Sequence, residues 1–368
     1  MINVGKRRRR RPMPHISVAS GILALIPMMI VFMASPTEAN QGPASVARRA
    51  WVMGTCLTVT VEANNRETAM NASEAALRAV TEVENRLSTW FDDSELSRLN
   101  SSAPGAAFPI SPELEADLRD ADHWWQETRG AFDPGIASLV EVWDLRGRGR
   151  QPSAVELTAA RAVTGFGYLN LDPGFARIET AGFGIEEGGF GKGVALREAA
   201  DAGREAGADC VLLDFGGQIA IGGNCQEFRL DVADPNRRDE RIAVLTVRSG
   251  SVATSGNSER GLVVNGVTQG HLLDPQTGSP APTWGSVTVL ASDPVAADCL
   301  STALYIMGPK AGGEWLQGRP EIEAVFVERS GEDTRMTATP GLEGRLEVIA
   351  GDLTFLQQKQ ARIKEFRQ

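Results

Sequence analysis

Apolar residues recur along this chain at the spacings of both helices and strands. Between residues 67 and 87 they return every three or four positions, which predicts an amphipathic helix. A second helix is expected from Ser111, a good N-cap followed by proline, to Gly130, where the apolar stripe ends. Residues 88–100 are expected to form a turn with a short helical piece, and residues 130–145 a turn followed by an apolar helix.

Five stretches rich in β-branched and apolar residues predict strands. They are residues 51–63, 208–217, 227–234, 242–247 and 285–292. Asp293 and Pro294 then open a helix that is expected to stop at Gly308, and residues 351–366 are expected to form a C-terminal helix. The expected irregular segments are a polar lead-in at residues 40–50 and an exposed loop at residues 146–152. The chain has too few βαβ units for a doubly wound sheet, so these elements predict an α+β fold with mixed sheets.

The N-terminus has the layout of a secretory signal peptide. A basic block at residues 6–11 precedes an almost uncharged apolar run at residues 16–33, and Thr37-Glu38-Ala39 provides a small-residue cleavage site. The apolar run is also long enough for an uncleaved membrane anchor. The expected regions are a signal peptide over residues 1–39, one domain over residues 40–350 and a helical tail over residues 351–368.

The charge and the cysteine pattern argue against two classes of function. The formal net charge is -10, and loss of residues 1–39 removes six basic residues and one acidic residue, so the exported chain carries -15. An acidic chain argues against a nucleic-acid partner, because phosphate backbones bind basic surfaces. The four cysteines form no CxxC and have no paired histidines, so a zinc site is not expected. An exported chain can form a disulfide, but Cys210 and Cys299 lie in apolar runs and are predicted to be small core residues.

The stretch EEGGFGKGVA, residues 186–195, places Lys192 among four glycines just ahead of a predicted helix. It does not fit the phosphate loop G-x-x-x-x-G-K-[ST], because Glu186 stands at the first glycine position and Gly193 follows the lysine. Its glycine spacing does not fit the dinucleotide pattern G-x-G-x-x-G either. Free backbone N–H groups at a helix start, with a lysine nearby, still favour an anionic ligand. A tight turn that packs a helix against a sheet explains the glycines equally well.

Three further segments offer candidate chemistry. Asp298 and Thr302 are four apart on a predicted helix, so they share one face and offer two hard oxygens to a Mg²⁺ that also binds a ligand phosphate. A solvated face or an intrahelical hydrogen bond is the alternative. His271, in the turn-rich HLLDPQTG, could be a general base, could orient a reacting hydroxyl, or could be an ordinary histidine. ATSGNSER supplies small hydroxyls and Arg260, which could hold a phosphate or close a loop. No G-x-S-x-G supports a serine hydrolase.

Taken in chain order, eight segments match a known pattern. They are MGT (53–55), LSTWFDDSELSRLN (87–100), GAFDP (130–134), GGFGKG (188–193), LLDFGG (212–217), ATSGNSER (253–260), HLLDPQTG (271–278) and ADCLSTALYIMG (297–308). This ordered series resembles the ApbE family of flavin transferases, also called FAD:protein FMN transferases. The resemblance covers roughly residues 50–330, nearly the whole exported chain.

The resemblance implies an ApbE-like α+β fold around a central FAD cleft. Family members bind FAD and Mg²⁺, move the FMN half onto a Thr or Ser hydroxyl of a partner protein and release AMP, so catalysis rests on positioning and on charge neutralisation at a pyrophosphate. The implied FAD contacts are Met53, Trp90, Ala131, Phe132, Asp133, Glu186, Lys192 and Leu272. The implied Mg²⁺ ligands are the Gly189 carbonyl, Asp298 and Thr302. His271 corresponds to the candidate base of the family, and Asp298 would assist through the metal.

Three residues depart from the family pattern. Glu186 stands where the family usually has Asp, Gly191 replaces a common Ala, and Cys56 replaces a bulky apolar residue. Glutamate keeps the negative charge but moves it by about one methylene, which is enough to alter a hydrogen bond to the ligand. We therefore expect Glu186 to affect FAD affinity more than the class of reaction.

The resemblance and the signal peptide together imply a periplasmic enzyme. Its acceptor would carry an [ST]-G-A-[ST] motif and would be an electron-transfer subunit that faces the periplasm. This chain contains no such motif, so it is not expected to be its own acceptor. Two alternatives stay open from sequence alone. The same metal site could serve an FAD pyrophosphatase that releases FMN and AMP, and the Glu186 departure would suit a non-catalytic FAD-binding maturation protein.

Overall fold

The structure is a computed structural model that describes residues 42–257, 262–264, 267–331 and 333–357. The predicted signal peptide and Arg260 lie outside the described residues. Residues 40–368 form one compact unit. Within the described part of the chain, no helix combines the length and the apolar character needed to cross a membrane.

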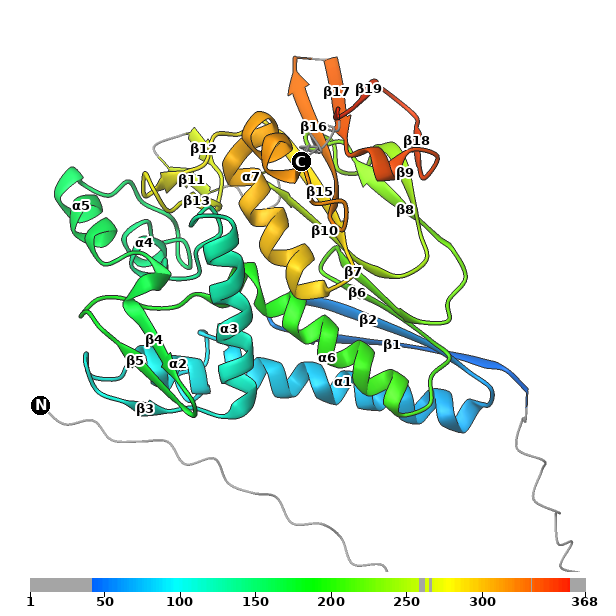
Figure 1. Cartoon of the computed structure of the whole chain (residues 1–368), viewed down its shortest axis with the longest axis horizontal. Coiled ribbons are helices and arrows are strands. Elements are labelled where there is room, and N and C mark those ends of the chain that lie inside the picture. The colour runs from blue at the N-terminus through cyan, green and yellow to red at the C-terminus, as the bar shows by residue number, and fades with distance from the viewer. Residues whose placement is uncertain (1–41, 258–261, 265–266, 332, 358–368) are drawn as a thin grey trace, which may run out of the picture. The chain divides into compact units, whose positions relative to one another are not determined.

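A nine-stranded sheet is the centre of the fold (Figure 1). In spatial order its strands are β1 (Ala44–Val52), β2 (Thr55–Ala63), β6 (Cys210–Phe215), β7 (Gln218–Gly223), β10 (Gly250–Gly256), β15 (Gly285–Ala291), β16 (Glu323–Ser330), β17 (Asp333–Ala338) and β19 (Asp352–Phe355). All neighbouring pairs are antiparallel except β17 and β19, which are parallel.

Seven α-helices and four small sheets complete the described part of the chain. The helices are α1 (Arg66–Leu87), α2 (Glu95–Asn100), α3 (Pro112–Glu127), α4 (Ala137–Val142), α5 (Ala154–Ala162), α6 (Gly191–Glu205) and α7 (Pro294–Leu316), with short 3₁₀ turns η1 (Phe166–Tyr168), η2 (Glu187–Gly189) and η3 (Pro340–Leu342). The small sheets are β3 (Phe108–Pro109) with β5 (Phe175–Ile178) and β4 (Leu169–Asp172), β8 (Phe228–Ala233) with β9 (Arg241–Val247) and β18 (Leu346–Val348), β11 (Leu262–Val264) with β12 (Val267–Gln269), and β13 (Leu273–Asp274) with β14 (Ser279–Pro280).

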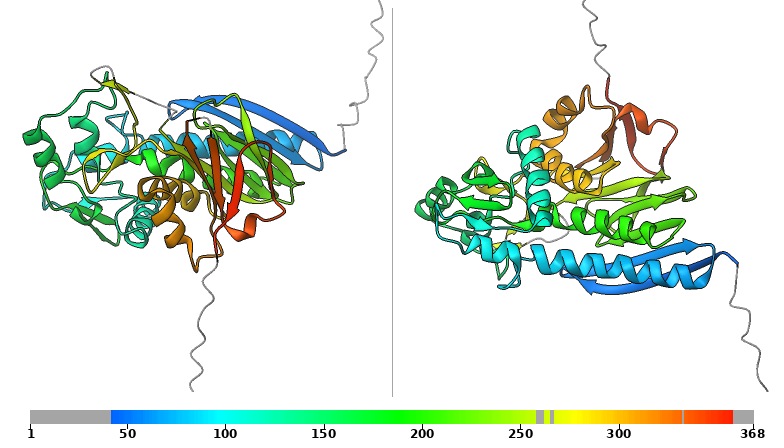
Figure 2. Two further views of the ribbon diagram at one scale, coloured as in Figure 1. Left: turned by 90° about the horizontal axis from the view of Figure 1, so that it is seen from above. Right: turned by 60° about the horizontal axis from the view of Figure 1, so that its bottom comes forward.

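The middle of the large sheet is buried on both faces, and every residue of strand β15 is buried. Helices α1, α6 and α7 cover one face (Figure 2), and the β8–β9–β18 sheet packs on the other. Strand β16 shows the consequence for the sequence, because Ala324 and Phe326 join the α7 cluster while Val325 and Val327 join the cluster under β9. A strand covered on both sides is expected to be continuously apolar. The predicted α+β class with mixed sheets is confirmed.

The strand expected at residues 51–63 is a hairpin, and that prediction was wrong at its start. Met53 (φ 46°) and Gly54 (φ 69°) both have positive φ, as a two-residue hairpin turn requires. Residues 44–50, which were expected to be part of a lead-in, belong to β1, and β1 pairs with β2 over its whole length. Its residues alternate between exposed and half-buried positions, because successive side chains point to opposite faces and α1 packs against one of them.

The C-terminal prediction was also wrong where the structure tests it. Asp352–Phe355 form strand β19 beside β17 instead of the start of a helix, and residues 358–368 lie outside the described residues. The helix predicted from Asp293 does break at Gly308, which has φ 74°, although helical turns resume at Pro309 and continue to Leu316. The helices expected over residues 67–87, within residues 88–100 and from Ser111 all form. Their N-caps are the side chains of Asn65, Ser94 and Ser111.

Cys210 is bonded to Cys225, which corrects its expected role as a free core cysteine. The bridge joins the start of β6 to the loop after β7, with Cα atoms 4.9 Å apart. Cys299 is buried and free as predicted, and Cys56 is exposed and free.

We expect Cys225→Ser to lower the free energy of unfolding by about 3 kcal/mol, because opening a loop of about 15 residues restores that much freedom to the unfolded chain. Urea unfolding under non-reducing conditions measures this effect. Cys56→Ser is the matched control, since it removes a free, exposed thiol, and it should change stability by less than about 0.5 kcal/mol. Equal stability of the two variants would contradict the prediction.

Candidate active site

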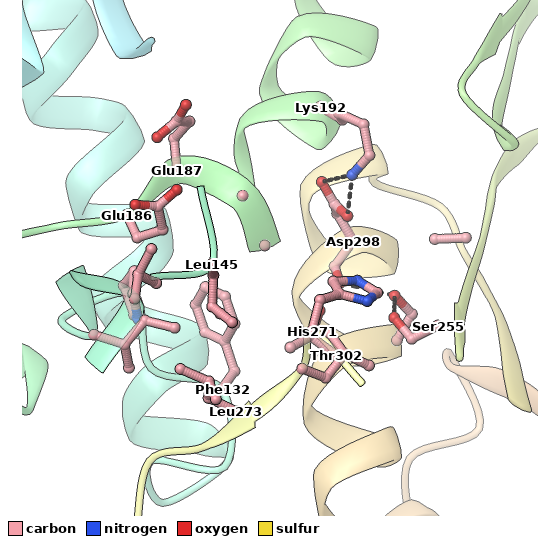
Figure 3. A pocket seen from close by; sticks show the side chains of 18 of the residues that line it. Phe132, Leu145, Glu186, Glu187, Lys192, Ser255, His271, Leu273, Asp298 and Thr302 are labelled. Carbon is pink, nitrogen blue, oxygen red and sulfur yellow. Dashed lines mark hydrogen bonds and ion pairs between the residues drawn. The ribbon is translucent and has the colours of Figure 1, made fainter. Parts of the chain in front are cut away.

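One cavity of about 510 Å³ contains all of the site residues predicted from the sequence. Its walls come from the β1–β2 turn, the loops after α1 and α3, η2, the start of α6, strand β10, the segment before β13 and one face of α7. The predicted residues that line it are Met53, Trp90, Ala131, Phe132, Asp133, Glu186, Gly189, Lys192, His271, Leu272, Asp298 and Thr302. Figure 3 shows two sides, with Phe132, Leu145 and Glu186 on one and Lys192, Asp298 and His271 on the other.

Asp298 is the buried acid of the cavity, with a side chain that is 6% exposed. The Nζ of Lys192 donates to its Oδ1 at 3.0 Å and to its Oδ2 at 3.3 Å, and the backbone N–H of Gly193 donates to Oδ2 at 2.9 Å. Gly193 permits this contact because a Cβ there would lie 2.6 Å from the Pro294 carbonyl oxygen. The glycine-rich segment therefore brings the start of α6 against the start of α7.

Gly189 and Thr302 lie beside this acid. Thr302 is one turn after Asp298 on α7, and a Cβ on Gly189 would lie 3.6 Å from the Thr302 hydroxyl oxygen. One carboxylate, one hydroxyl and a nearby backbone segment provide hard oxygen donors, which suit a Mg²⁺ that keeps several waters. Within the described residues no group of three or more His, Cys, Asp or Glu side chains is arranged so that it could hold a metal ion by itself. The donors therefore fit Mg²⁺ with substrate phosphate, and they do not fit zinc.

His271 is held at the cavity by the segment around it. The Leu272 N–H donates to Oδ1 of buried Asn257 at 3.3 Å, and the Leu272 carbonyl accepts from Ala281 at 2.8 Å. A Cβ on Gly270 would lie 1.8 Å from the Asn257 carboxamide carbon, so only glycine fits directly before the histidine. In Figure 3 the His271 ring lies near Thr302 and Ser255. The Ser255 hydroxyl oxygen is 2.8 Å from that of Ser301.

Arg146 and Glu186 form an ion pair at the opposite side of the cavity. Arg146 Nη2 lies 2.5 Å from Glu186 Oε2, and Nη1 donates to the Thr89 carbonyl at 2.8 Å. The guanidinium carbon is 5.0 Å from the centroid of the Trp90 ring. Burial raises the pKa of Glu186 to about 7, and the neighbouring Glu187 carboxylate adds to that rise while Arg146 opposes it. The departure from the family pattern at Glu186 thus comes with an arginine partner.

Asp133 anchors the loop that forms the floor beside Phe132. Its carboxylate accepts from the Gly135 N–H at 2.8 Å and from the Trp125 indole at 3.0 Å. Burial nevertheless raises the pKa of Asp133 to about 6, above its ordinary value of 3.8. The side chain therefore has a structural task in this loop in addition to lining the cavity.

Comparison with known proteins identifies the family of this chain. The model of the ApbE family matches residues 53–326. The chain belongs to the ApbE family. It is 29% identical over 325 residues to an FAD:protein FMN transferase of Treponema pallidum, covering 82% of this chain and 89% of that protein. A protein of the same name from Vibrio cholerae is 29% identical over 244 residues, covering 64% of this chain and 73% of that protein.

Solved ApbE structures have the same fold. The ApbE protein of Thermotoga maritima superposes with a TM-score of 0.72 at 28% identity, covering 77% of this chain and 94% of that one. The flavinyl transferase ApbE of Pseudomonas stutzeri also gives 0.72, at 26% identity over 82% of this chain and 97% of that one. The ApbE-like fold expected from the ordered segments is confirmed.

In this ApbE-family chain, two residues that shape the cavity were missed by sequence reasoning. Arg146 lies in the segment predicted as an exposed loop, 40 positions from Glu186, and no spacing rule connects them. Asn257 belongs to ATSGNSER, which was recognised for its hydroxyls and arginine, but its buried carboxamide is what fixes the His271 segment. Its neighbours in the sequence are glycine, serine and glutamate, so no local pattern indicated that its carboxamide is buried.

The charges that line the cavity do not favour an anion by themselves. Four carboxylates, those of Asp133, Glu186, Glu187 and Asp298, face two cationic side chains, Arg146 and Lys192. Both cations are already paired with carboxylates of the cavity. Additional positive charge would therefore favour the binding of a pyrophosphate in this cavity.

Proposed function

We propose that this chain is an exported, Mg²⁺-dependent FAD:protein FMN transferase that moves FMN from FAD onto a Thr or Ser hydroxyl of a partner protein and releases AMP. Membership in the ApbE family and the names of its relatives support flavin transfer. The observation that carries the proposal is the convergence in one cavity of twelve residues dispersed between Met53 and Thr302. The pair Lys192–Asp298 and the histidine at the same side supply the required chemistry.

The cavity suits an in-line displacement at phosphorus. The acceptor hydroxyl oxygen would attack the FMN phosphorus while the bond to the AMP oxygen breaks, and His271 would take the hydroxyl proton. Asp298, Thr302 and Gly189 would hold Mg²⁺, which when bound neutralises charge on the pyrophosphate. Phe132, with the apolar side chains near it, would exclude water from one end of FAD.

The excess of carboxylates in the cavity supports the metal requirement. An FAD pyrophosphate brings negative charge to a wall that already has two more carboxylates than cations. A divalent cation bound by Asp298 removes that imbalance, which is the reason for expecting no FAD turnover in its absence.

Export is supported by two independent features. Residues 1–39 have the layout of a signal peptide. The Cys210–Cys225 disulfide belongs to proteins of oxidising compartments such as the periplasm. We therefore propose a periplasmic location and an acceptor that is a periplasm-facing electron-transfer subunit with an [ST]-G-A-[ST] motif.

Intact-mass spectrometry tests the proposed activity. The protein is incubated with FAD, Mg²⁺ and an acceptor domain that carries the motif, and the acceptor should gain the mass of one FMN unit. The same acceptor with its Thr or Ser changed to Ala should gain nothing, and neither should a reaction with EDTA. Free FMN and AMP formed without an acceptor would instead identify an FAD pyrophosphatase. Tight FAD binding with neither product would leave a non-catalytic FAD-binding protein.

A further inference from the structure

The Lys192 ammonium already lies beside Asp298, the proposed metal ligand, where a metal cation would bind. Its ammonium contacts both oxygens of Asp298, at 3.0 and 3.3 Å, while the carboxylate also accepts from the Gly193 N–H. The carboxylate is 6% exposed and the lysine side chain 30% exposed. Three hydrogen-bond contacts thus engage the acid, and the lysine is the more accessible of the two partners.

The ammonium and a divalent cation cannot both use this carboxylate in the same way. An ionised carboxylate has about four acceptor sites, and three hydrogen-bond contacts already reach Asp298. A metal ion on either oxygen would also repel an ammonium that stays within hydrogen-bond distance of the same group. Metal binding therefore requires Lys192 to move.

The Lys192 side chain can move within the cavity. It lies in the first turn of α6, a helix of 15 residues, and its side chain lines the cavity. Four rotatable methylenes let the ammonium leave Asp298 without a change in the backbone. The other cationic side chain that lines the cavity, Arg146, is held by Glu186 at the far side. Lys192 is therefore the side chain best placed to meet a phosphate that arrives beside Asp298.

We propose that Lys192 is a positioning residue that occupies Asp298 in the FAD-free protein and exchanges onto the pyrophosphate of FAD when Mg²⁺ takes its place. The proposal rests on the proposed function and goes beyond it, because it makes Mg²⁺ and FAD binding interdependent. Mg²⁺ displaces Lys192 from Asp298, so the ammonium becomes available to the pyrophosphate. FAD draws Lys192 away from Asp298, so the carboxylate becomes available to Mg²⁺. The coupling is reciprocal, so Mg²⁺ must tighten FAD by the same factor by which FAD tightens Mg²⁺.

Removal of the lysine tests this exchange through metal affinity in the absence of FAD. Mn²⁺ serves as the probe, measured by electron paramagnetic resonance with Mg²⁺ as competitor. Lys192→Met should bind Mn²⁺ about tenfold more tightly than the wild type, because its competitor has been removed. Lys192→Arg keeps a cation beside Asp298 and should stay close to the wild type.

Arg146→Met is the matched control. It removes one positive charge from the same cavity without touching Asp298, so it should change Mn²⁺ affinity by less than about threefold. Mg²⁺ should also increase the affinity for FAD by a smaller factor in Lys192→Met than in the wild type. Without the lysine, only the direct contact between the metal and the phosphate couples the two ligands. Lys192→Gln, measured in parallel, provides a second lysine-free chain whose unfolding transition can be compared with that of the wild type.

The possible outcomes distinguish the proposed exchange of Lys192 from the proposed transferase function. Unchanged or weaker Mn²⁺ binding by both lysine-free variants overturns the exchange while leaving the transferase proposal intact. An increase of the same size in Arg146→Met also overturns it, because general electrostatics would then explain the effect. A wild-type protein that binds no Mn²⁺, with or without FAD, overturns both the exchange and the proposed Mg²⁺ dependence.

Discussion

Replacement of Asp298 by alanine is expected to lower kcat/KM for FMN transfer by at least about 1000-fold. Asp298 is the carboxylate of the proposed metal site, and its side chain also holds Lys192 and the Gly193 N–H. The substitution removes the ligand that positions the neutralising cation and frees the lysine from its partner. The rate at which the acceptor gains mass, measured over a series of FAD concentrations, gives kcat and KM separately.

Controls distinguish lost chemistry from lost folding. Asp298→Asn keeps the volume and one acceptor oxygen but removes the charge, so it should be nearly as inactive as the alanine variant. Asp201→Ala removes a carboxylate from the exposed surface of α6, where the side chain is 57% exposed, and should transfer FMN at the wild-type rate. A variant at position 298 that unfolds normally and keeps more than a tenth of the activity would contradict the assigned role.

The success of sequence reasoning about the fold depended on how local the cause of each element was. The start of α3 was predictable because Ser111 and Pro112 fix a helix N-terminus by contacts within four residues. Strand β19 was not, because its partner β17 lies in a different part of the chain and the pairing is parallel. Strand β1 was hidden for a related reason, since an edge strand has the polar pattern of a surface segment.

The candidate site likewise has residues that the sequence could predict and partners that only the folded chain brings to them. The resemblance of eight ordered segments to the ApbE family was sufficient to predict residues that share one cavity. Spacing alone left the glycine-rich segment, His271 and the Asp298–Thr302 pair open to structural explanations. The partners that fix these residues were not predictable, because Arg146 meets Glu186, and Asn257 meets Leu272, only through the folded chain. The disulfide was missed for the same reason. Cys210 and Cys225 come together because β6 and β7 form a hairpin.

A buried charge network joins the helices that present the site. Arg86 near the end of α1 donates to Asp117 on α3 at 2.7 Å and also pairs with Glu198 on α6. The side chains of Arg86 and Asp117 are 9% and 2% exposed. Because α6 carries Lys192 and packs against α7, this network supports the relative placement of the two helices that form the proposed metal site.

Arg86→Met is expected to lower the free energy of unfolding by about 3–5 kcal/mol at pH 8, because it leaves the Asp117 carboxylate buried without its main partner. Burial raises the pKa of Asp117 to about 6 even with Arg86 present, and loss of the guanidinium raises that pKa further. Protonation of Asp117 therefore stabilises the folded variant as the pH falls. The loss of stability should be smaller at pH 5 than at pH 8, as urea unfolding at the two pH values can show.

Arg119→Met is the matched control for this network, since Arg119 lies on α3 and pairs with Glu115 one turn away, with 49% of its side chain exposed. An exposed pair of this kind contributes about 0–1 kcal/mol, so the control should lose little stability at either pH. If Arg86→Met lost no more than the control, the network would be dispensable for folding. If its loss were the same at pH 5 and pH 8, the unpaired Asp117 carboxylate could not be the cause, and the lost packing of the arginine side chain would explain it instead.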